Sequence, residues 1–223
     1  MKRLIAIISC HRYAYPKYDE GLSHHSGQDE LRENIIRQTW LRLVDRTKID
    51  VKFFYGNPPD GIYLQGTGED DVILNVKDDY LSLPLKVQAV FKWAFNNSYN
   101  YIFKVDNDTM VFPDRLLAAF NSKLDYEGFV IRGGPVDYCA GCGYWLSRES
   151  FSHVASAEWN GDTAEDRWVG TVLNKVGIRP TNNEQMQNCH CEVCAEKYGP
   201  NFISFHCWPK VEMMRDFMRS RGE

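Results

Sequence analysis

The sequence lacks any long hydrophobic run: its first apolar stretch, Leu4 to Ile8, is far too short to span a bilayer. It also lacks the length and the small-residue cleavage site of a signal peptide. No internal repeat and no Pro- or Ser-rich linker divides the 223 residues. We therefore expect a single domain over residues 1–223, located in the cytoplasm unless its start has been trimmed.

An excess of basic residues is also missing. Lys and Arg number 26 against 30 Asp and Glu, which gives a net charge of −4, so we do not expect the wide basic footprint of a nucleic-acid-binding protein. The seven cysteines are few and odd in number, which argues against a complete disulfide framework. The 43% hydrophobic content is that of a globular domain with a substantial core.

Short apolar runs alternate with helical patterns along the chain, which indicates an α/β fold with a mixed, mostly parallel central sheet flanked by helices. A long polar stretch, Cys10 to Gln28, follows the first run. The expected strands are residues 4–9, 51–55, 72–76, 101–105, 129–131 and 144–147; the expected helices are residues 29–44, 163–176 and 209–219, with a further one opened by Ser82-Leu83-Pro84.

The most informative segment is the end of the buried run 101–105, which leads into Asp106-Asn107-Asp108. Ligands of α/β folds bind at the carboxyl edge of the sheet. Asp106 and Asp108 are two residues apart, so an extended backbone directs both side chains the same way. Paired carboxylates suit Mg²⁺ or Mn²⁺ holding substrate phosphates. The alternative is a simple turn, since all three residues favour turns.

Four further motifs accompany this one, and their order along the chain carries a resemblance. The series is Ile36-Arg37-Gln38-Thr39-Trp40, Asp79-Tyr80-(x4)-Leu85-Lys86, Lys104-Val105-Asp106-Asn107-Asp108, Tyr138 to Ser147, and Glu165-Asp166-Arg167-Trp168-Val169-Gly170. It resembles the β-1,3-galactosyltransferase and Fringe-like glycosyltransferases, family 31 of the sequence classification. The resemblance runs from about Ile36 to Gly170.

The resemblance implies a GT-A fold, a UDP-sugar donor, a Mn²⁺ (or Mg²⁺) ion and inversion at the anomeric carbon. Asp106 and Asp108 would be the D-x-D acids, with Asp108 the more direct metal ligand. Arg37 would lie near the nucleotide, although it could equally be a surface arginine of a helix. Asp79 and Lys86 are expected on the donor side by the same resemblance.

Asp166 matches the second acid of the family's E-D-V-x-x-G motif and would be the base that deprotonates the acceptor hydroxyl. Here Arg167 replaces the usual small apolar residue, which would put a fixed cation beside that base if the two side chains meet. A structural role is the alternative: Thr163 to Asp166 has the pattern of a helix N-terminal capping box. The two roles are compatible.

The end of the chain adds a histidine and a cysteine cluster. Fringe-like enzymes complete the metal site with a late histidine, for which His206 is the candidate by order, and imidazole beside carboxylates suits Mn²⁺. Cys189, Cys191 and Cys194 have zinc-like spacing. A structural Zn²⁺, disulfides and reduced thiols all remain open for them.

The sequence therefore predicts a metal-dependent inverting transferase that moves a hexose from a UDP-sugar to a glycan or glycoconjugate hydroxyl, of β-1,3-galactosyl or N-acetylhexosaminyl type. The main alternative is a non-catalytic sugar or nucleotide-sugar binding protein on the same scaffold. A nucleotidyltransferase or nuclease would leave the Arg37 and Asp166 motifs unexplained. Typical eukaryotic family members carry a membrane anchor, so we expect a bacterial or viral cytoplasmic form or a trimmed, soluble secretory-pathway enzyme.

Overall fold

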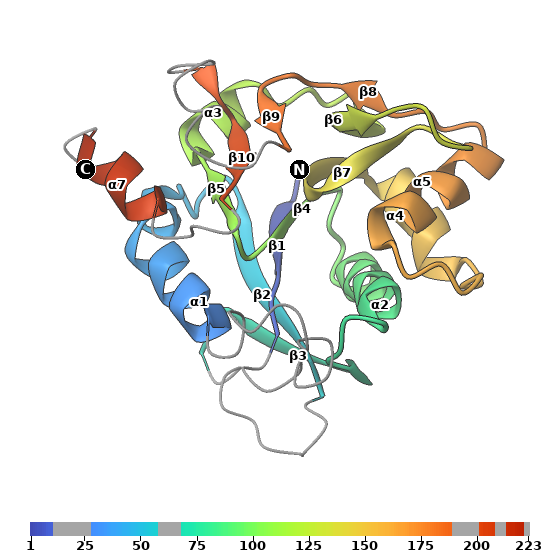
Figure 1. Ribbon diagram of the computed structural model, residues 1–223, viewed down its shortest axis with the longest axis horizontal. Helices are drawn as coiled ribbons and strands as arrows, with labels where there is room; N and C mark the ends of the chain where they lie inside the picture. The colour runs from blue at the N-terminus through green and yellow to red at the C-terminus, as the bar shows by residue number, and fades with distance from the viewer. Residues whose placement is uncertain (11–27, 58–67, 189–200, 208–212, 221–223) are drawn as a thin grey trace.

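The computed structural model describes residues 1–10, 28–57, 68–188, 201–207 and 213–220. Its centre is a seven-stranded sheet in the order β3-β2-β1-β4-β7-β6-β8, beside a three-stranded sheet in the order β5-β10-β9 (Figure 1). The strands of the larger sheet are β1 (Arg3–Ile8), β2 (Asp50–Asn57), β3 (Asp71–Lys77), β4 (Tyr101–Asp106), β6 (Tyr126–Ile131), β7 (Tyr138–Ser147) and β8 (Thr181–Asn182). The smaller sheet contains β5 (Thr109–Val111), β9 (Met186–Gln187) and β10 (Ser204–His206).

The larger sheet is mixed and mostly parallel, as the sequence predicts. Strands β3, β2, β1 and β4 run parallel, whereas β7 runs antiparallel to both β4 and β6. Strand β1 is buried along almost its whole length because both of its neighbours are parallel strands and both sheet faces are covered. The carboxyl ends of β1 and β4 therefore meet at one edge of the sheet.

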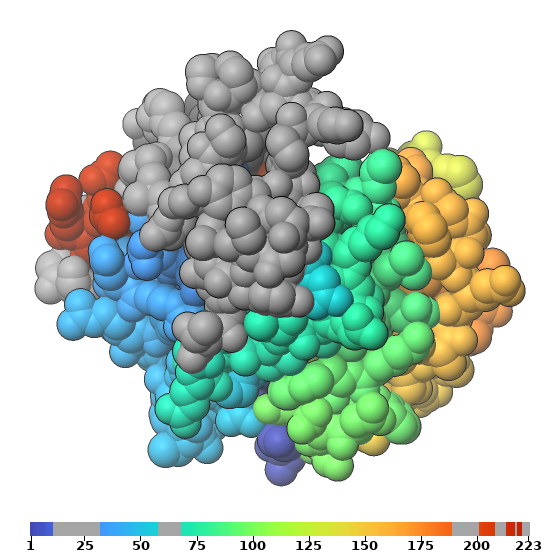
Figure 2. Space-filling view, turned by 90° about the horizontal axis from the view of Figure 1, so that it is seen from below, coloured from blue at the N-terminus to red at the C-terminus, as the bar shows by residue number. Residues whose placement is uncertain are grey.

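Helices cover both faces. The flank with α1 (Gln28–Gln38) also holds α7 (Met213–Ser220), and the opposite flank holds α4 (Arg148–Ser156) and α5 (Glu165–Lys175), as the two views of Figures 1 and 2 agree. Helix α2 (Leu83–Asn96) packs against α4, and α3 (Pro113–Ala118) lies near the short 3₁₀ helix η1 (Trp40–Leu43). No helix in the described ranges combines the length and the apolar composition needed to cross a bilayer.

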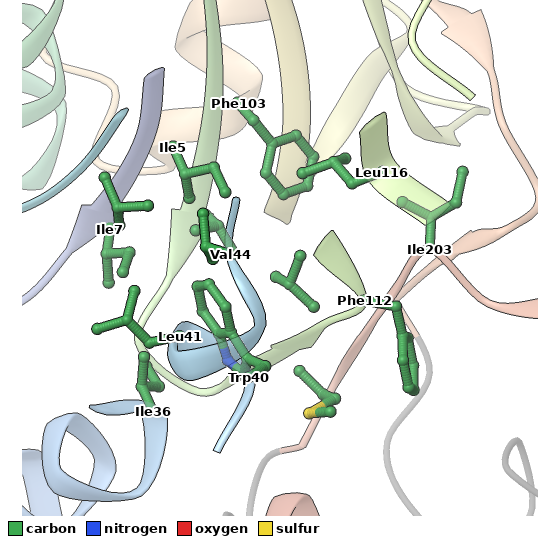
Figure 3. Close-up of a cluster of buried hydrophobic side chains, with 14 of the residues drawn as sticks. Ile5, Ile7, Ile36, Trp40, Leu41, Val44, Phe103, Phe112, Leu116 and Ile203 are labelled. Atoms are coloured by element: carbon green, nitrogen blue, oxygen red, sulfur yellow. The ribbon is translucent and has the colours of Figure 1, made fainter. Parts of the chain in front are cut away.

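Two hydrophobic clusters lie on the two faces of the sheet. The first surrounds Trp40, which lies fully buried among Ile36, Leu41 and Val44 and faces the strand residues Ile5 and Ile7 (Figure 3). The second gathers side chains of α2, α4 and α5 against the other face of β1, β4 and β7. Trp40, the last residue of the Ile36–Trp40 motif, therefore belongs to the core.

Three large apolar side chains of the expected helices are exposed: Leu43, Phe95 and Val176. All three lie at helix ends. The expected helix 29–44 ends at Gln38, where Thr39 donates its hydroxyl to the Ile35 carbonyl at 2.5 Å and the chain tightens into η1, so the 3.6-residue periodicity no longer applies to Leu43. Val176 likewise follows the last turn of α5, before Gly177 at φ +85°.

Several elements were not anticipated, namely α3, α4, β5, β8 and β9. The expected C-terminal helix is present as α7 over Met213–Ser220, and its expected start, residues 209–212, lies outside the described residues. The polar stretch expected after Cys10 falls on residues 11–27, outside the described residues.

Candidate active site

The site begins at the carboxyl end of β4. Asp106 is the last residue of β4 and pairs in register with Ile8, the last residue of β1. Because β7 runs antiparallel to β4, with Gly143 opposite Val105, its first half extends past this edge and brings Gly141 next to Asp106. The strand-end placement is therefore correct for Asp106, whereas Asn107 and Asp108 form the turn between β4 and β5, so the extended backbone expected to direct both acids the same way ends at Asp106.

Asp108 is nearly buried between Arg32 and His206. His206 Nε2 lies 3.1 Å from Asp108 Oδ1, and Arg32 Nη1 donates to Asp108 Oδ2 at 3.3 Å. Backbone pairing brings the histidine there: β10 pairs with β5 just after the two acids, and the Cys207 N–H donates to the Asp108 carbonyl at 2.7 Å. Burial alone would raise the pKa of Asp108, but the hydrogen bond and charge of His206, with Arg32, outweigh it and hold that pKa below its ordinary value.

Asp106 is more open, with its side chain 32% exposed, and it faces a fully buried lysine. Lys104 Nζ donates to Asp106 Oδ1 at 2.7 Å, to Glu165 Oε2 at 2.9 Å and to the Gly141 carbonyl at 2.6 Å. Burial, together with the charge of Asp108, raises the pKa of Asp106 against the opposing charge of Lys104. Burial also raises the pKa of Glu165 to about 7, despite Lys104. The positively charged groups of the site therefore do not fully compensate the negative charge of its carboxylates.

Asp166 lies in the first turn of α5, half-buried, with Oδ2 accepting the Gly141 N–H at 3.0 Å. The expected capping box is wrong, because Ala164 rather than Thr163 is the N-cap and no side chain caps it. Arg167 does not turn toward Asp166: its guanidinium binds Asp162 at 2.7 and 2.8 Å.

Three carboxylates converge on Gly141. A Cβ added there would lie 3.5 Å from Asp106 Oδ2, from Asp166 Oδ2 and from Glu165 Oε2. The acids come from β4 and α5, so elements distant in the sequence meet at this glycine. A carboxylate in such a group can accept a proton from a bound ligand.

The three residues expected on the donor side have other contacts in the described structure. Arg37 binds Asp71 at 2.6 Å and Glu33, and lies 4.0 Å from the Phe53 ring centroid, linking α1 to β2 and β3. The role of Arg37, Asp79 and Lys86 in donor binding stays a prediction.

Asp79 accepts the Ser82 N–H at 2.7 Å at the start of α2. Lys86 is only 1% exposed; it pairs with the neighbouring Asp78, and it also donates to the Ser9 carbonyl at 2.8 Å.

The zinc-like cysteines Cys189, Cys191 and Cys194 lie outside the described residues. Cys139, Cys142 and Cys207 are buried reduced thiols. Among the residues the structure describes, no group of three or more His, Cys, Asp or Glu side chains is arranged around one point as a metal site.

Lys104, Glu165 and Arg32 were not assigned roles from the sequence. Lys104 carried a usable signal, because it precedes Asp106 by two residues on a strand and so shares its face. Glu165 is the first residue of the Glu165–Gly170 motif. Arg32 offered no signal, since its meeting with Asp108 depends on the packing of α1.

Comparison with known proteins agrees with this geometry. The family described as Galactosyltransferase matches residues 31–136. The chain is 25% identical over 186 residues to β-1,3-galactosyltransferase 1 of Mus musculus, covering 66% of this chain and 57% of the relative. It is 25% identical over 203 residues to "Probable beta-1,3-galactosyltransferase 12" of Arabidopsis thaliana, covering 72% and 54%. The chain thus spans just over half the length of these relatives.

The fold is similar to that of a solved glycosyltransferase involved in glycosylation of the major capsid of PBCV-1. The TM-score is 0.53 at 13% identity, with 97% of this chain and 99% of the other covered. With the sheet order and the acidic strand end described above, these matches lead to one conclusion: the chain has a GT-A fold and is similar, over residues 31–136, to the galactosyltransferase family.

Proposed function

We propose that this domain transfers a hexose from a UDP-sugar to an acceptor hydroxyl with inversion at the anomeric carbon. The observation that carries the proposal is the convergence of Asp106, Asp166 and Glu165 on Gly141, beside Asp108 and His206. Relatives named β-1,3-galactosyltransferases make UDP-galactose the first donor to test.

The residues present fit a divalent cation in their chemistry. Asp106, Asp108 and His206 offer two carboxylates and an imidazole, a donor set suited to Mn²⁺. Burial and the charge of Asp108 raise the pKa of Asp106, which means that they disfavour its ionised form. A bound cation would favour that form. When bound, the ion would stabilise negative charge on the departing diphosphate. Asp108 now receives that neutralisation from Arg32 and His206.

Asp166 is the proposed base. In the transfer step the acceptor oxygen forms a bond to the anomeric carbon while the bond from that carbon to the diphosphate oxygen breaks. The hydroxyl proton passes to Asp166, and the bonding pair leaves with UDP. The Gly141 N–H holds one oxygen of Asp166 at 3.0 Å, which fixes the orientation of the carboxylate.

A non-catalytic nucleotide-sugar binding protein is the competing function. Both functions predict binding of UDP with Mn²⁺, so the test is turnover. We expect UDP release from a panel of UDP-sugars with Mn²⁺, by slow hydrolysis or with a galactoside or N-acetylhexosaminide acceptor, and loss of release with EDTA. Binding of UDP without release under any acceptor would identify the binding protein instead.

A further inference from the structure

We propose that Lys104 is a positioning residue that holds the donor-side acid Asp106 and the base-side acid Asp166 in one fixed arrangement. The inference rests on the proposed function and deepens it. Lys104 lies in β4, two residues before Asp106, and its side chain is fully buried.

All three N–H donors of the Lys104 ammonium are used, and each goes to a different element. One reaches Asp106 at the end of β4, one reaches the Gly141 carbonyl in β7, and one reaches Glu165 at the start of α5. An ammonium has three donors and no acceptor, so this group is saturated. It therefore joins the two strands and the helix that build the site.

Two residues connect Lys104 to Asp166, namely Gly141 and Glu165. Gly141 gives its carbonyl to Lys104 and its N–H to Asp166, so one residue joins the cation to the proposed base. Glu165 is the residue before Asp166, and it is held on its other oxygen by the Tyr144 hydroxyl.

The N-cap of α5, Ala164, has no side-chain cap, and two backbone N–H groups hold the Asp166 carboxylate: that of Gly141 on Oδ2 at 3.0 Å and that of Arg167 on Oδ1 at 2.8 Å. Of these two contacts, the one from Gly141 depends on Lys104, which holds the Gly141 carbonyl.

Lys104 could serve the fold alone by compensating the charge of the buried acids. Variants can separate that structural role from the positioning of Asp106 and Asp166. Lys104→Met removes the ammonium, and Glu165→Gln removes the carboxylic acid that pairs with it. The double variant Lys104→Met/Glu165→Gln therefore removes the link without leaving Glu165 as an unpaired buried acid. Val154→Ala is the matched control, since Val154 is a fully buried residue of α4 whose truncation lowers stability away from the site.

For the double variant we expect kcat to fall on the order of 100-fold, because small misplacements of reacting groups have effects of that size. The donor KM and the Kd for UDP with Mn²⁺, measured by titration calorimetry, should change far less than kcat. Val154→Ala should retain kcat at an equal or larger loss of Tm.

Hydrogen exchange gives a readout besides activity. In the double variant we expect faster exchange across residues 138–144 and the first turn of α5, but not in β1 or α2. Val154→Ala should not show this pattern.

Tyr144→Phe tests the same link without a change of charge, since it removes only the hydroxyl that holds Glu165. We expect a fall in kcat of about tenfold, the size that corresponds to one hydrogen bond to a charged group, and this variant serves if the double variant does not fold.

A double variant, or Tyr144→Phe, with wild-type kcat and wild-type exchange would overturn the inference and leave the proposed function standing. A wild-type protein that binds UDP but never releases it from a UDP-sugar would overturn both.

Discussion

Two fully buried lysines lie near the same sheet edge, and their surroundings differ. Lys86 faces one carboxylate, Asp78, and the pair is closed from solvent at 1% and 0% exposure. Lys104 faces two carboxylates, Asp106 and Glu165, and the first of these opens to solvent at 32%. One group is balanced and sealed, whereas the other is acidic and open.

The difference separates charges that hold the fold together from charges available for chemistry. A buried, balanced pair satisfies its own atoms and presents nothing to a ligand. Burial, together with the charges of Asp166 and Asp106, raises the pKa of Glu165 to about 7 against the charge of Lys104, so the second group gains from a bound proton. Burial of a lysine is therefore no guide to function until its carboxylates are counted.

The largest effect expected in the acidic group is that of Asp166→Asn. Removing a general base lowers turnover by about 10²–10⁴-fold, so kcat should fall within that range while UDP binding is retained. Steady-state kinetics with a UDP-sugar and titration calorimetry with UDP and Mn²⁺ give the two readouts.

The matched control for Asp166→Asn is Asp162→Asn, a nearby acid that binds Arg167 instead of Gly141. We expect a much smaller change of kcat for this control. Equal losses in both variants would show that Asp166 acts through the local fold rather than as a base.

Much of this arrangement could be predicted from the sequence, and the reason is local. The strand ending at Asp106 and the helix carrying Asp166 are encoded by apolar periodicity and by adjacent motifs. The pairing of Lys104 with Glu165 could not be predicted from spacing, since 61 residues separate them and only the antiparallel insertion of β7 brings the elements together. Arg167 illustrates the converse: its neighbour in sequence is Asp166, but its partner is Asp162.

The next largest effect is expected on the affinity for Mn²⁺. Asp108→Asn should weaken Mn²⁺ binding in the presence of UDP by at least about 10–100-fold, the loss known for groups that only support metal ligands. Excess Mn²⁺ should restore part of the activity.

Asp70→Asn, which removes a carboxylate paired with Arg46 away from the site, provides the control for Asp108→Asn and should bind Mn²⁺ as the wild type does. Unchanged Mn²⁺ affinity in Asp108→Asn would contradict its place as a ligand.

A smaller effect is expected from filling the space among the acids. Gly141→Ala puts a methyl group 3.5 Å from three carboxylate oxygens, which is an ordinary contact distance, so the fold should tolerate it. The methyl group still occupies space that a ligand would use, and kcat/KM should fall on the order of tenfold.

Gly170→Ala provides the contrast to Gly141→Ala, because its Cβ would lie 2.4 Å from Tyr138 Cβ. Such overpacking lowers stability by about 1–3 kcal/mol, so Tm should fall more in this variant than in Gly141→Ala. The reverse order of Tm losses would show that the space at Gly141 is needed by the fold.

The smallest effect on turnover is expected from variants of the buried pair of Lys86 and Asp78. Lys86→Met removes the buried cation that pairs with Asp78, which should lower the free energy of unfolding by about 3–5 kcal/mol. If Lys86 serves only the fold, kcat per folded molecule stays close to that of the wild type, and Lys86→Met/Asp78→Asn regains part of the lost stability. Denaturant unfolding and kinetics normalised to the folded fraction measure both quantities. A raised donor KM that the double variant fails to correct would instead place Lys86 against the donor, and the contrast between the two lysines would no longer hold.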